Sequence, residues 1–344
     1  MTGAALAIVL VVGGGRVLSE SIEIGTMVAF LLYVQRFFEP IRTLTMHYAA
    51  LQRAVASGHR IFELLDIPLD IADKPEAKPI GDVDGRVEFK NVTFGYKPER
   101  PILRNISFVA EPGQTIALVG PTGSGKTSIT ALAHRFYDVQ QGSISIDGQD
   151  IRDVTQESIG HVMGMVLQEP FLFSKSVLEN VSYNTENATR EDVVAACKII
   201  GAHDFVMQLD NGYDTTLEQR GSNLSVGQRQ LLSFALALVA DPKILVLDEA
   251  TANIDSYTER IIQEALKKLL EGRTALVIAH RLSTIRNSNQ IIVVRDGEIV
   301  EKGTHDELLA ETGLYAQLWQ TNYTSFDDIA GNADSITGAP ISST

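Results

Sequence analysis

The feature that most constrains this chain is the segment Gly120-Pro121-Thr122-Gly123-Ser124-Gly125-Lys126-Thr127. It follows a short apolar run, residues 115–119, and precedes a helix-like run, residues 128–135. Glycines allow successive backbone N–H groups to turn inward around an anion, and the start of a helix adds positive potential. The pattern therefore predicts a strand, a phosphate-binding loop and a helix. Lys126 would reach the β- and γ-phosphates of a nucleotide, and the Thr127 hydroxyl would bind Mg²⁺. A glycine-rich turn arising by chance is disfavoured by this context.

A second phosphate-binding candidate is Leu224-Ser225-Val226-Gly227-Gln228, at the start of a predicted helix. Ser225 and Gln228 have the spacing of a capping box, which by itself is a sufficient explanation. A helix N-terminus that carries serine and glycine is also an anion site. Because one nucleotide needs one phosphate cradle, two cradles indicate that each works with a different nucleotide, and hence with a second copy of the protein.

An acidic pair, Asp248-Glu249, ends the apolar run 244–247. Alone, the pair would be explained as favourable charges at the start of the next helix. Together with a phosphate-binding loop, it predicts that Asp248 holds Mg²⁺ through water and that Glu249 polarises an attacking water.

Charge and cysteine content exclude some classes of protein. The 344 residues include 29 basic and 43 acidic side chains, for a formal charge of −14. This balance speaks against nucleic acid as the main partner, because phosphate backbones attract Lys- and Arg-rich surfaces. The single cysteine, Cys197, excludes an internal disulfide, and its apolar neighbours predict a small buried side chain rather than a reactive thiol.

Two apolar stretches at the N-terminus predict a membrane hairpin. Residues 4–12 form the first, and residues 24–38 form the second, which ends near Pro40. A spanning helix needs about 20 mostly apolar residues. The loop 19–23 has no Lys or Arg, whereas arginines follow the second stretch, which places the C-terminal end of the hairpin in the cytosol. These arginines are Arg36, Arg42, Arg53 and Arg60. A signal peptide and a buried soluble hairpin are the alternatives.

The rest of the chain alternates between predicted helices and strands. Residues 48–65 have the pattern of a soluble helix, and the proline- and charge-rich segment that follows, to Gly85, has that of a linker. Residues 291–300 predict a hairpin on the turn Asp296-Gly297. Residues 304–307 form a capping box that opens a last helix, which we expect to reach about Trp319. The Ser/Thr/Asp/Gly-rich tail is predicted to be disordered.

The order of these motifs resembles that of the ATP-binding-cassette (ABC) ATPases. The phosphate-binding loop is followed by Gln168 in Val166-Leu167-Gln168-Glu169-Pro170, by 224–228, by Leu247-Asp248-Glu249-Ala250-Thr251 and by Ala279-His280-Arg281. The chain is most similar to the ATPase half of exporter-type ABC transporters. This resemblance implies an α/β P-loop NTPase fold, with a RecA-like core, an antiparallel β subdomain and an α-helical subdomain, preceded by an all-α transmembrane hairpin.

The resemblance also implies domain limits and partners. A partial transmembrane domain would cover residues 1–66, a linker 67–85, the nucleotide-binding domain 86–320 and a disordered tail 321–344. The cofactors would be ATP and Mg²⁺. The partners would be a second half-transporter chain, in a homodimer or a heterodimer, together with membrane lipid and an exported substrate, but no nucleic acid. The protein would lie in the cell membrane as a multi-pass protein with its nucleotide-binding domain in the cytoplasm.

The resemblance further assigns roles at matching positions. Tyr96 would stack on adenine, Gln168 would sense Mg²⁺, and His280 would contact the γ-phosphate. Ser225 and Gly227 would touch the γ-phosphate held by the partner's loop. The implied catalytic residues are Glu249, His280, Gln168 and Lys126, and the implied metal ligands are Thr127, Gln168 and Asp248. The implied nucleotide contacts are Tyr96, Gly120, Pro121, Thr122, Gly123, Ser124, Gly125, Lys126, Thr127, Ser128, Ser225, Val226, Gly227, Gln228 and Asp255.

The chain departs from the family pattern in sequence and in length. Val226 stands where the commonest pattern has glycine, and a β-branched residue does not readily adopt a positive φ. A half-transporter of this family has six membrane helices, and the resemblance implies that this chain would begin inside the fifth. We therefore expect ATP hydrolysis without transport by this chain alone. The alternative functions are a soluble or non-transport ABC ATPase and a nucleotide-binding fragment without transport activity of its own.

Overall fold

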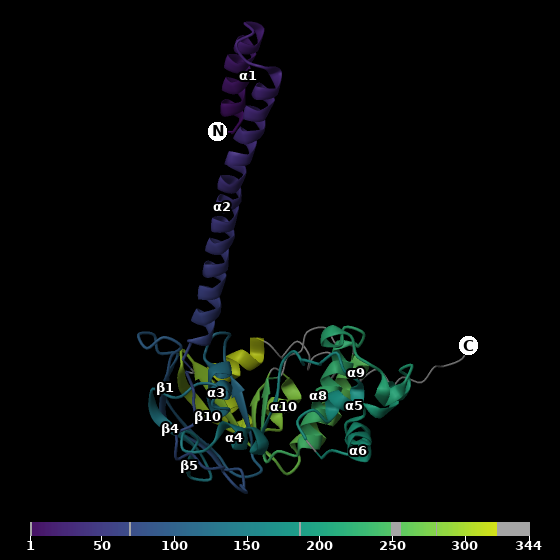
Figure 1. The fold of residues 1–344 in the computed structure, drawn as a ribbon. Helices are drawn as coiled ribbons and strands as arrows, with labels where there is room; N and C mark the ends of the chain where they lie inside the picture. Colours follow the sequence, from purple (N-terminus) through teal and green to yellow (C-terminus); the bar gives the residue numbers. More distant parts are fainter. Residues whose placement is uncertain (1, 69, 186, 249–255, 280, 322–344) are drawn as a thin grey trace, which may run out of the picture. The chain divides into compact units, whose positions relative to one another are not determined.

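The computed structural model describes residues 2–68, 70–185, 187–248, 256–279 and 281–321 (Figure 1). The chain divides into two compact units, Met1–Asp70 and Ile71–Thr344. Each unit is described by itself below.

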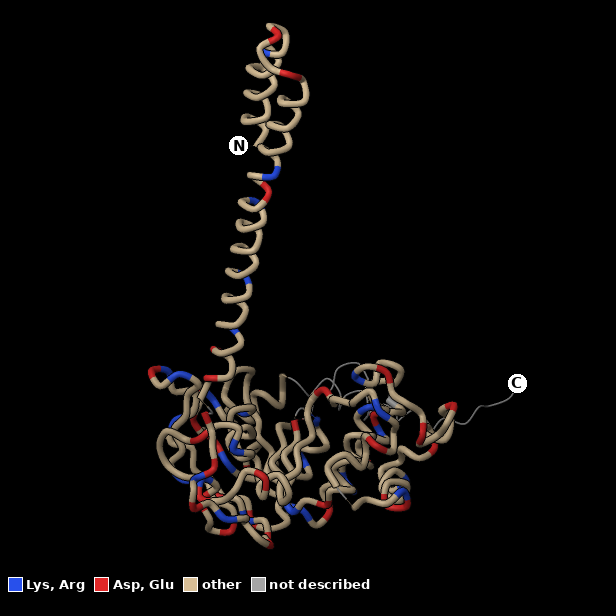
Figure 2. Tube along the Cα trace, viewed as in Figure 1, with Lys and Arg blue, Asp and Glu red and all other residues tan. Residues whose placement is uncertain are grey.

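The N-terminal unit is a helical hairpin of α1 (Thr2–Leu18) and α2 (Ile24–Leu65). Gly13 allows the helices to approach, because a Cβ there would lie 3.1 Å from Cγ of Met27. Apart from the region of the turn, Figure 2 shows no charged residue in α1 or in the first part of α2. Among the described residues, α2 is the one helix long and apolar enough to cross a membrane. At 17 residues, α1 is shorter than that.

The second helix continues where the sequence predicts a break. Residues 24–38 and 48–65, expected as two helices separated near Pro40, form one helix of 42 residues with Pro40 inside it. The expected break is therefore wrong. Proline removes one backbone N–H from the helix, and the helix-forming residues on both sides keep the remaining bonds.

The C-terminal unit contains two sheets. The larger has the strand order β10-β9-β3-β8-β7-β6, in which β10 is antiparallel to β9 and the other neighbours are parallel. Its strands are β3 (Thr115–Val119), β6 (Met163–Val166), β7 (Ile244–Asp248), β8 (Thr274–Ile278), β9 (Gln290–Arg295) and β10 (Glu298–Gly303). The smaller sheet is antiparallel, with the order β2-β1-β4-β5. Its strands are β1 (Val87–Phe94), β2 (Leu103–Ala110), β4 (Gln141–Ile146) and β5 (Gln149–Asp150).

The labelled helices of this unit differ in length. They are α3 (Lys126–Ala133), α4 (Gln156–Val162), α5 (Val177–Val181), α6 (Arg190–Ile200), α7 (His203–Met207), α8 (Val226–Ala240), α9 (Ser256–Leu270), α10 (Leu282–Arg286) and α11 (His305–Ala310). Two 3₁₀ turns, η1 (Gly212–Asp214) and η2 (Gln219–Gly221), precede α8.

The larger sheet separates two apolar cores. On β3, Ile116 and Leu118 join one core with the smaller sheet and α3, whereas Ala117 and Val119 join a second core with α5, α6, α8 and α9. This alternation follows from the two-residue period of a strand. The helices α3 and α8 therefore pack on opposite faces of the larger sheet, and Figure 1 shows α8 grouped with α5, α6 and α9. The arrangement confirms the predicted α/β fold with its antiparallel and helical parts.

The last predicted helix is divided in the structure. The capping box of Thr304 and Glu307 is confirmed, but α11 ends at Ala310. Thr312 has φ 51°, which breaks the helix, and residues 314–321 form a further helical segment. The Glu301 carboxylate accepts the N–H groups that start this segment, those of Leu314 at 2.5 Å and Tyr315 at 3.0 Å. The single continuous helix was therefore wrong, because Glu301 on β10 supplies a second helix start.

Cys197 is fully buried on α6. Burial raises the pKa of its thiol to about 11, so the thiol stays protonated and uncharged at neutral pH. This confirms the prediction of a small buried side chain.

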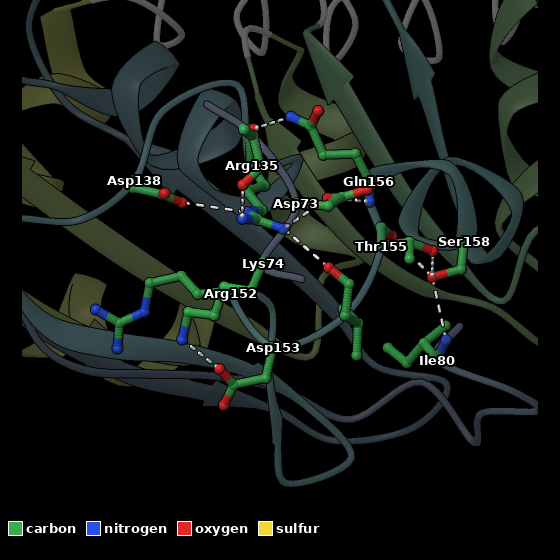
Figure 3. A network of polar contacts seen from close by, with 12 residues as sticks. Asp73, Lys74, Ile80, Arg135, Asp138, Arg152, Asp153, Thr155, Gln156 and Ser158 are labelled. Atoms are coloured by element: carbon green, nitrogen blue, oxygen red, sulfur yellow. Dashed lines mark hydrogen bonds and ion pairs between the residues drawn. The ribbon is translucent and has the colours of Figure 1, made fainter. Parts of the chain in front are cut away.

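Most of the predicted linker, from Ile71 onward, is part of the C-terminal unit, and Figure 3 shows some of its contacts there. Ile80 and Val83 are buried, and the backbone N–H of Ile80 donates to Ser158 Oγ at 3.1 Å. The N–H of Thr155 donates to the Lys78 carbonyl at 3.1 Å. Prolines and charges correctly indicated an irregular backbone here. They did not reveal the apolar side chains that fix residues 71–85 to the domain.

A buried arginine fastens the start of this segment. Arg135 is 1% exposed, and its guanidinium donates to the carbonyls of Val154 at 2.9 Å and Ala72 at 3.3 Å. It also donates to Asp138 at 3.2 Å and Asp73 at 3.3 Å (Figure 3). These acceptors come from three separate parts of the chain, so no local sequence pattern could show that Arg135 would join them.

Replacing Arg135 with alanine should lower the free energy of unfolding of the C-terminal unit by about 2–3 kcal/mol, because two carbonyls, that of Val154 being buried, and two carboxylates lose their donor. Urea unfolding followed by the fluorescence of the single tryptophan, Trp319, measures this. The matched control is Lys74→Ala, which removes the exposed ion pair with Asp153 and should change the midpoint little. Equal midpoint shifts in the two variants would contradict the assignment.

Candidate nucleotide-binding site

The loop from Gly120 to Thr127 has a backbone that requires glycine. Gly120 has φ 154°, and a Cβ there would collide with the carbonyl oxygen of Val294 on β9. Gly125 has φ 106° and is the N-cap of α3. Positive φ is costly for residues with a side chain. The glycines therefore allow the loop to curl between β3 and α3 as the sequence predicts, with the amides of the first turn of α3 at the loop's end.

Lys126 lies over the loop rather than in solvent. Its ammonium donates to the carbonyls of Gly120 and Pro121, both at 2.9 Å, and the residue is 8% exposed. Burial lowers the pKa of Lys126, and the charge of Asp248 opposes this shift. A partly desolvated cation at the start of a helix favours a polyanion such as a triphosphate.

The carboxyl ends of the parallel strands bring the other predicted residues to the same edge of the sheet. The loop follows β3, Asp248 ends β7, and Gln168 lies two residues after β6. Strand β8 lies between β3 and β7 and leads to Ala279. In open α/β sheets, ligands bind at this edge. Glu249, Asp255 and His280 lie outside the described residues.

The available side chains suit a magnesium ion held together with phosphate. Thr127 and Gln168 are exposed and Asp248 is partly buried, and each has a side-chain oxygen. Mg²⁺ prefers oxygen ligands and is usually bound through one or two carboxylates plus substrate phosphates. In the part of the chain that the structure describes, no group of three or more His, Cys, Asp or Glu residues forms a complete protein cage. These donors fit Mg²⁺ that completes its shell with phosphate and water.

Tyr96 lies on a tight turn after β1. Its hydroxyl is 3.2 Å from Ser128 Oγ on α3, and its side chain is half exposed. Its ring contacts Phe94 edge-on, with centroids 5.1 Å apart. An exposed ring anchored to the phosphate-binding helix has the properties of a stacking platform for a base.

The second predicted phosphate site opens α8. Ser225 accepts the N–H of Gln228 at 3.2 Å, and Gln228 Oε1 accepts the N–H of Ser225 at 2.9 Å, so the capping box is present. Val226 is the first residue of the helix and lacks a positive φ. The substitution of the usual glycine therefore causes no backbone strain. Gly227 is needed for packing, because a Cβ there would collide with Cγ2 of Thr258 on α9.

The turn between β9 and β10 supports the phosphate-binding loop. The sequence did not predict this support. The N–H of Gly297 donates to the Ser124 carbonyl at 3.1 Å, and the N–H of Arg104 donates to the Gly297 carbonyl at 2.8 Å. The Asp296-Gly297 pair correctly predicted a turn, but its partners are far away in the sequence. No local pattern could show that the turn braces the loop.

A family model described as "ABC transporter" matches residues 103–252. That match contains the loop, Gln168, the start of α8 and the acidic pair in the predicted order. The chain belongs to the ABC transporter family.

Relatives of this ABC transporter chain extend the similarity to the N-terminal hairpin. The chain is 46% identical over 319 residues to an uncharacterised ABC transporter ATP-binding protein, YknV, of Bacillus subtilis. The match covers 93% of this chain and 53% of that protein. The chain is 44% identical to a fatty acid ABC transporter ATP-binding/permease protein of Mycobacterium tuberculosis, covering 90% and 49%. It is also 44% identical to an ATP-dependent lipid A-core flippase of Desulfotalea psychrophila, covering 92% and 55%.

A solved structure of a bacterial Atm1-family ABC exporter with ATP bound is similar in fold. Its TM-score is 0.74 at 37% identity, covering 94% of this chain and 56% of that one. The ABC transporter chain thus spans about half the length of the relatives it matches.

His134, which caps the C-terminal end of α3, should make the ABC domain sensitive to acid. Burial lowers its pKa from 6.5 to about 4, against a smaller opposing effect of a bond to the Gly164 backbone. The unfolded chain gains this proton near pH 6.5 and the folded chain does not, so stability is lost as pH falls from 6.5 towards 4. We expect a loss of about 1–2 kcal/mol by pH 5. His134→Phe should flatten this part of the pH profile of urea midpoints. An unchanged pH slope in that variant would exclude His134 as the cause.

The Gly227→Ala variant should be destabilised by its collision with Thr258, and Thr258→Ser should relieve this by removing Cγ2. We expect the melting temperature to fall in Gly227→Ala and to recover in the double variant. A double variant that stays as unstable as the single one would show that the contact with Thr258 is not the reason for glycine. ATP turnover of the recovered variant then separates packing from any role of Gly227 at the nucleotide.

Proposed function

We propose that this chain is the ATPase portion of an ABC exporter, which binds and hydrolyses ATP with Mg²⁺ and drives export across a membrane. The nucleotide-binding domain would include the packed segment from residue 71 and extend to about residue 320. One observation carries the proposal. The phosphate-binding loop, Asp248 and Gln168 meet at one edge of a parallel sheet, whereas the helix that begins after Ser225 packs on the opposite face from α3.

Separate placement of the two phosphate signatures supports a dimer with shared sites. In such a dimer, the loop of one chain would hold the nucleotide and the start of α8 of the other would close on its γ-phosphate. A head-to-tail pair of this kind has two-fold symmetry. The second chain would be another copy or a related half-transporter, and closure would move the attached membrane helices.

Each residue of the loop edge has a proposed task. Lys126 and the loop amides would hold the β- and γ-phosphates. Thr127, Asp248 and Gln168 would hold Mg²⁺, which supplies positive charge to the phosphate oxygens. Glu249 would accept a proton from the attacking water. His280 would contact the γ-phosphate, and Asp255 would be a nucleotide contact, as the sequence resemblance implies.

The hairpin supports the membrane location. No residue of α1 or α2 is buried, and Val11, Phe30 and Phe37 are each more than half exposed. An apolar surface of this kind requires a lipid or protein environment. We propose a multi-pass protein in the plasma or inner membrane, with its nucleotide-binding domain in the cytoplasm. Two relatives are named for fatty acid and lipid A-core, so amphipathic lipids are the first substrate class to test.

Membrane fractionation separates this proposal from a soluble ABC ATPase. The expressed chain should remain in the pellet after an alkaline carbonate wash. Recovery of the whole chain in the soluble fraction would favour the soluble alternative.

The Glu249→Gln variant tests the catalytic proposal. It should bind ATP, form a dimer in its presence and lose steady-state ATP turnover, because the amide cannot accept the proton of the attacking water. Phosphate release and size-exclusion chromatography with ATP measure the two effects. The control is Glu259→Gln, an exposed substitution in the first turn of α9 that should keep turnover. Unchanged turnover in Glu249→Gln would remove Glu249 from the mechanism.

A further inference from the structure

Tyr137 lies beside Tyr96 although 41 residues separate them in sequence. Their ring centroids are 5.1 Å apart, and the rings meet edge to face at 78°. Both rings also contact Phe94, which is buried at the end of β1. Tyr137 is 42% exposed and Tyr96 is 51% exposed. The three rings therefore form a cluster in which Phe94 is buried and the two tyrosine rings are exposed.

The chain around Tyr137 is held rigidly. Arg135 has φ 54°, and its guanidinium donates to the Asp138 carboxylate at 3.2 Å (Figure 3). This hydrogen bond joins the residues on either side of Phe136 and Tyr137. Two residues further on, Gln140 Nε2 donates to the Gly95 carbonyl at 2.8 Å, and the Gln140 N–H donates to Thr93 at 3.1 Å. Gln140, three residues after Tyr137, thus bonds the segment after α3 to the residues just before Tyr96.

This connection fixes the Tyr96 ring relative to the phosphate-binding loop. The same helix, α3, begins at Lys126, carries Ser128 against the Tyr96 hydroxyl, and leads into the segment that carries Tyr137. The Tyr96 ring contacts Ser128 through its hydroxyl and also contacts Phe94 and Tyr137, so it has little conformational freedom to lose when a ligand stacks on it. Restricting a side chain before binding increases affinity because less ordering is needed afterwards.

We propose that Tyr137 is a positioning residue for the nucleotide base, which holds Tyr96 in the orientation that stacks on adenine. The inference rests on the proposed function, in which Tyr96 carries the base. Tyr137 acts through Tyr96 and has no part in holding phosphate. Its loss should therefore weaken binding of a nucleotide without weakening binding of a triphosphate that lacks a base.

The experiment compares ATP with inorganic tripolyphosphate as ligands of the detergent-solubilised full chain. Titration calorimetry in EDTA prevents hydrolysis. Tyr137→Ala should weaken ATP binding about 3- to 10-fold, because the Tyr96 ring must then be ordered on binding. Tripolyphosphate affinity should stay unchanged. Tyr137→Phe keeps the ring and should bind ATP within about 2-fold of the wild type. In a Tyr96→Ala background, Tyr137→Ala should cause no further loss of ATP affinity.

The matched control is Phe136→Ala, because Phe136 is an exposed neighbouring ring that stacks on His134. It should leave affinity for ATP unchanged. An equal loss of ATP and tripolyphosphate affinity in Tyr137→Ala, or additive losses with Tyr96→Ala, would overturn the role of Tyr137. Unchanged ATP affinity in Tyr96→Ala would instead overturn the proposed base platform itself. The two failures are therefore distinguishable.

Discussion

The packing of the short helix α3 between the two sheets is the constraint on which the rest of the site depends. Ile129, Leu132 and Ala133 are fully buried there, so the helix has little freedom to shift. Its first two residues, Lys126 and Thr127, are the last two of the phosphate-binding loop, and the segment after its last turn contains Arg135. One buried helix thereby fixes the phosphate cradle, the turn that holds Tyr137 and the packed segment after residue 71. Cores tolerate displacement poorly because they are closely packed, and this rigidity gives the site a defined geometry before ligand arrives.

The placement of α3 and α8 on opposite faces of the larger sheet is the observation that supports the proposed dimer. The alternating side chains of β3 send one set into the core with α3 and the other into the core with α8. The loop and the start of α8 are therefore carried by different layers. In the proposed dimer, which combines them from two chains, nucleotide binding would depend on association.

Much of the fold and of the candidate site was predictable because it depends on local patterns. The strand before the loop, the hairpin turn at 296–297 and the capping boxes at Ser225 and Thr304 depend on neighbouring residues, and all are present. Two other features were not predictable from local patterns. Pro40 was expected to end a helix, but α2 continues through it. Within the stretch 67–85, which was predicted as a linker, the contacts that hold residues 71–85 join residues distant in sequence, so no local signal contained them.

The sequence by itself determined the phosphate-binding loop, the acidic strand end and the order of motifs, because glycine backbone freedom, hydrogen-bond donors and charge are properties of individual residues at fixed spacing. Tertiary structure alone decided that the turn at Gly297 braces the loop, that Arg135 donates hydrogen bonds to three parts of the chain, and that Tyr137 contacts Tyr96. These contacts join residues that are distant in sequence. Strand order and core packing bring them together, and no pattern within one segment contains that information.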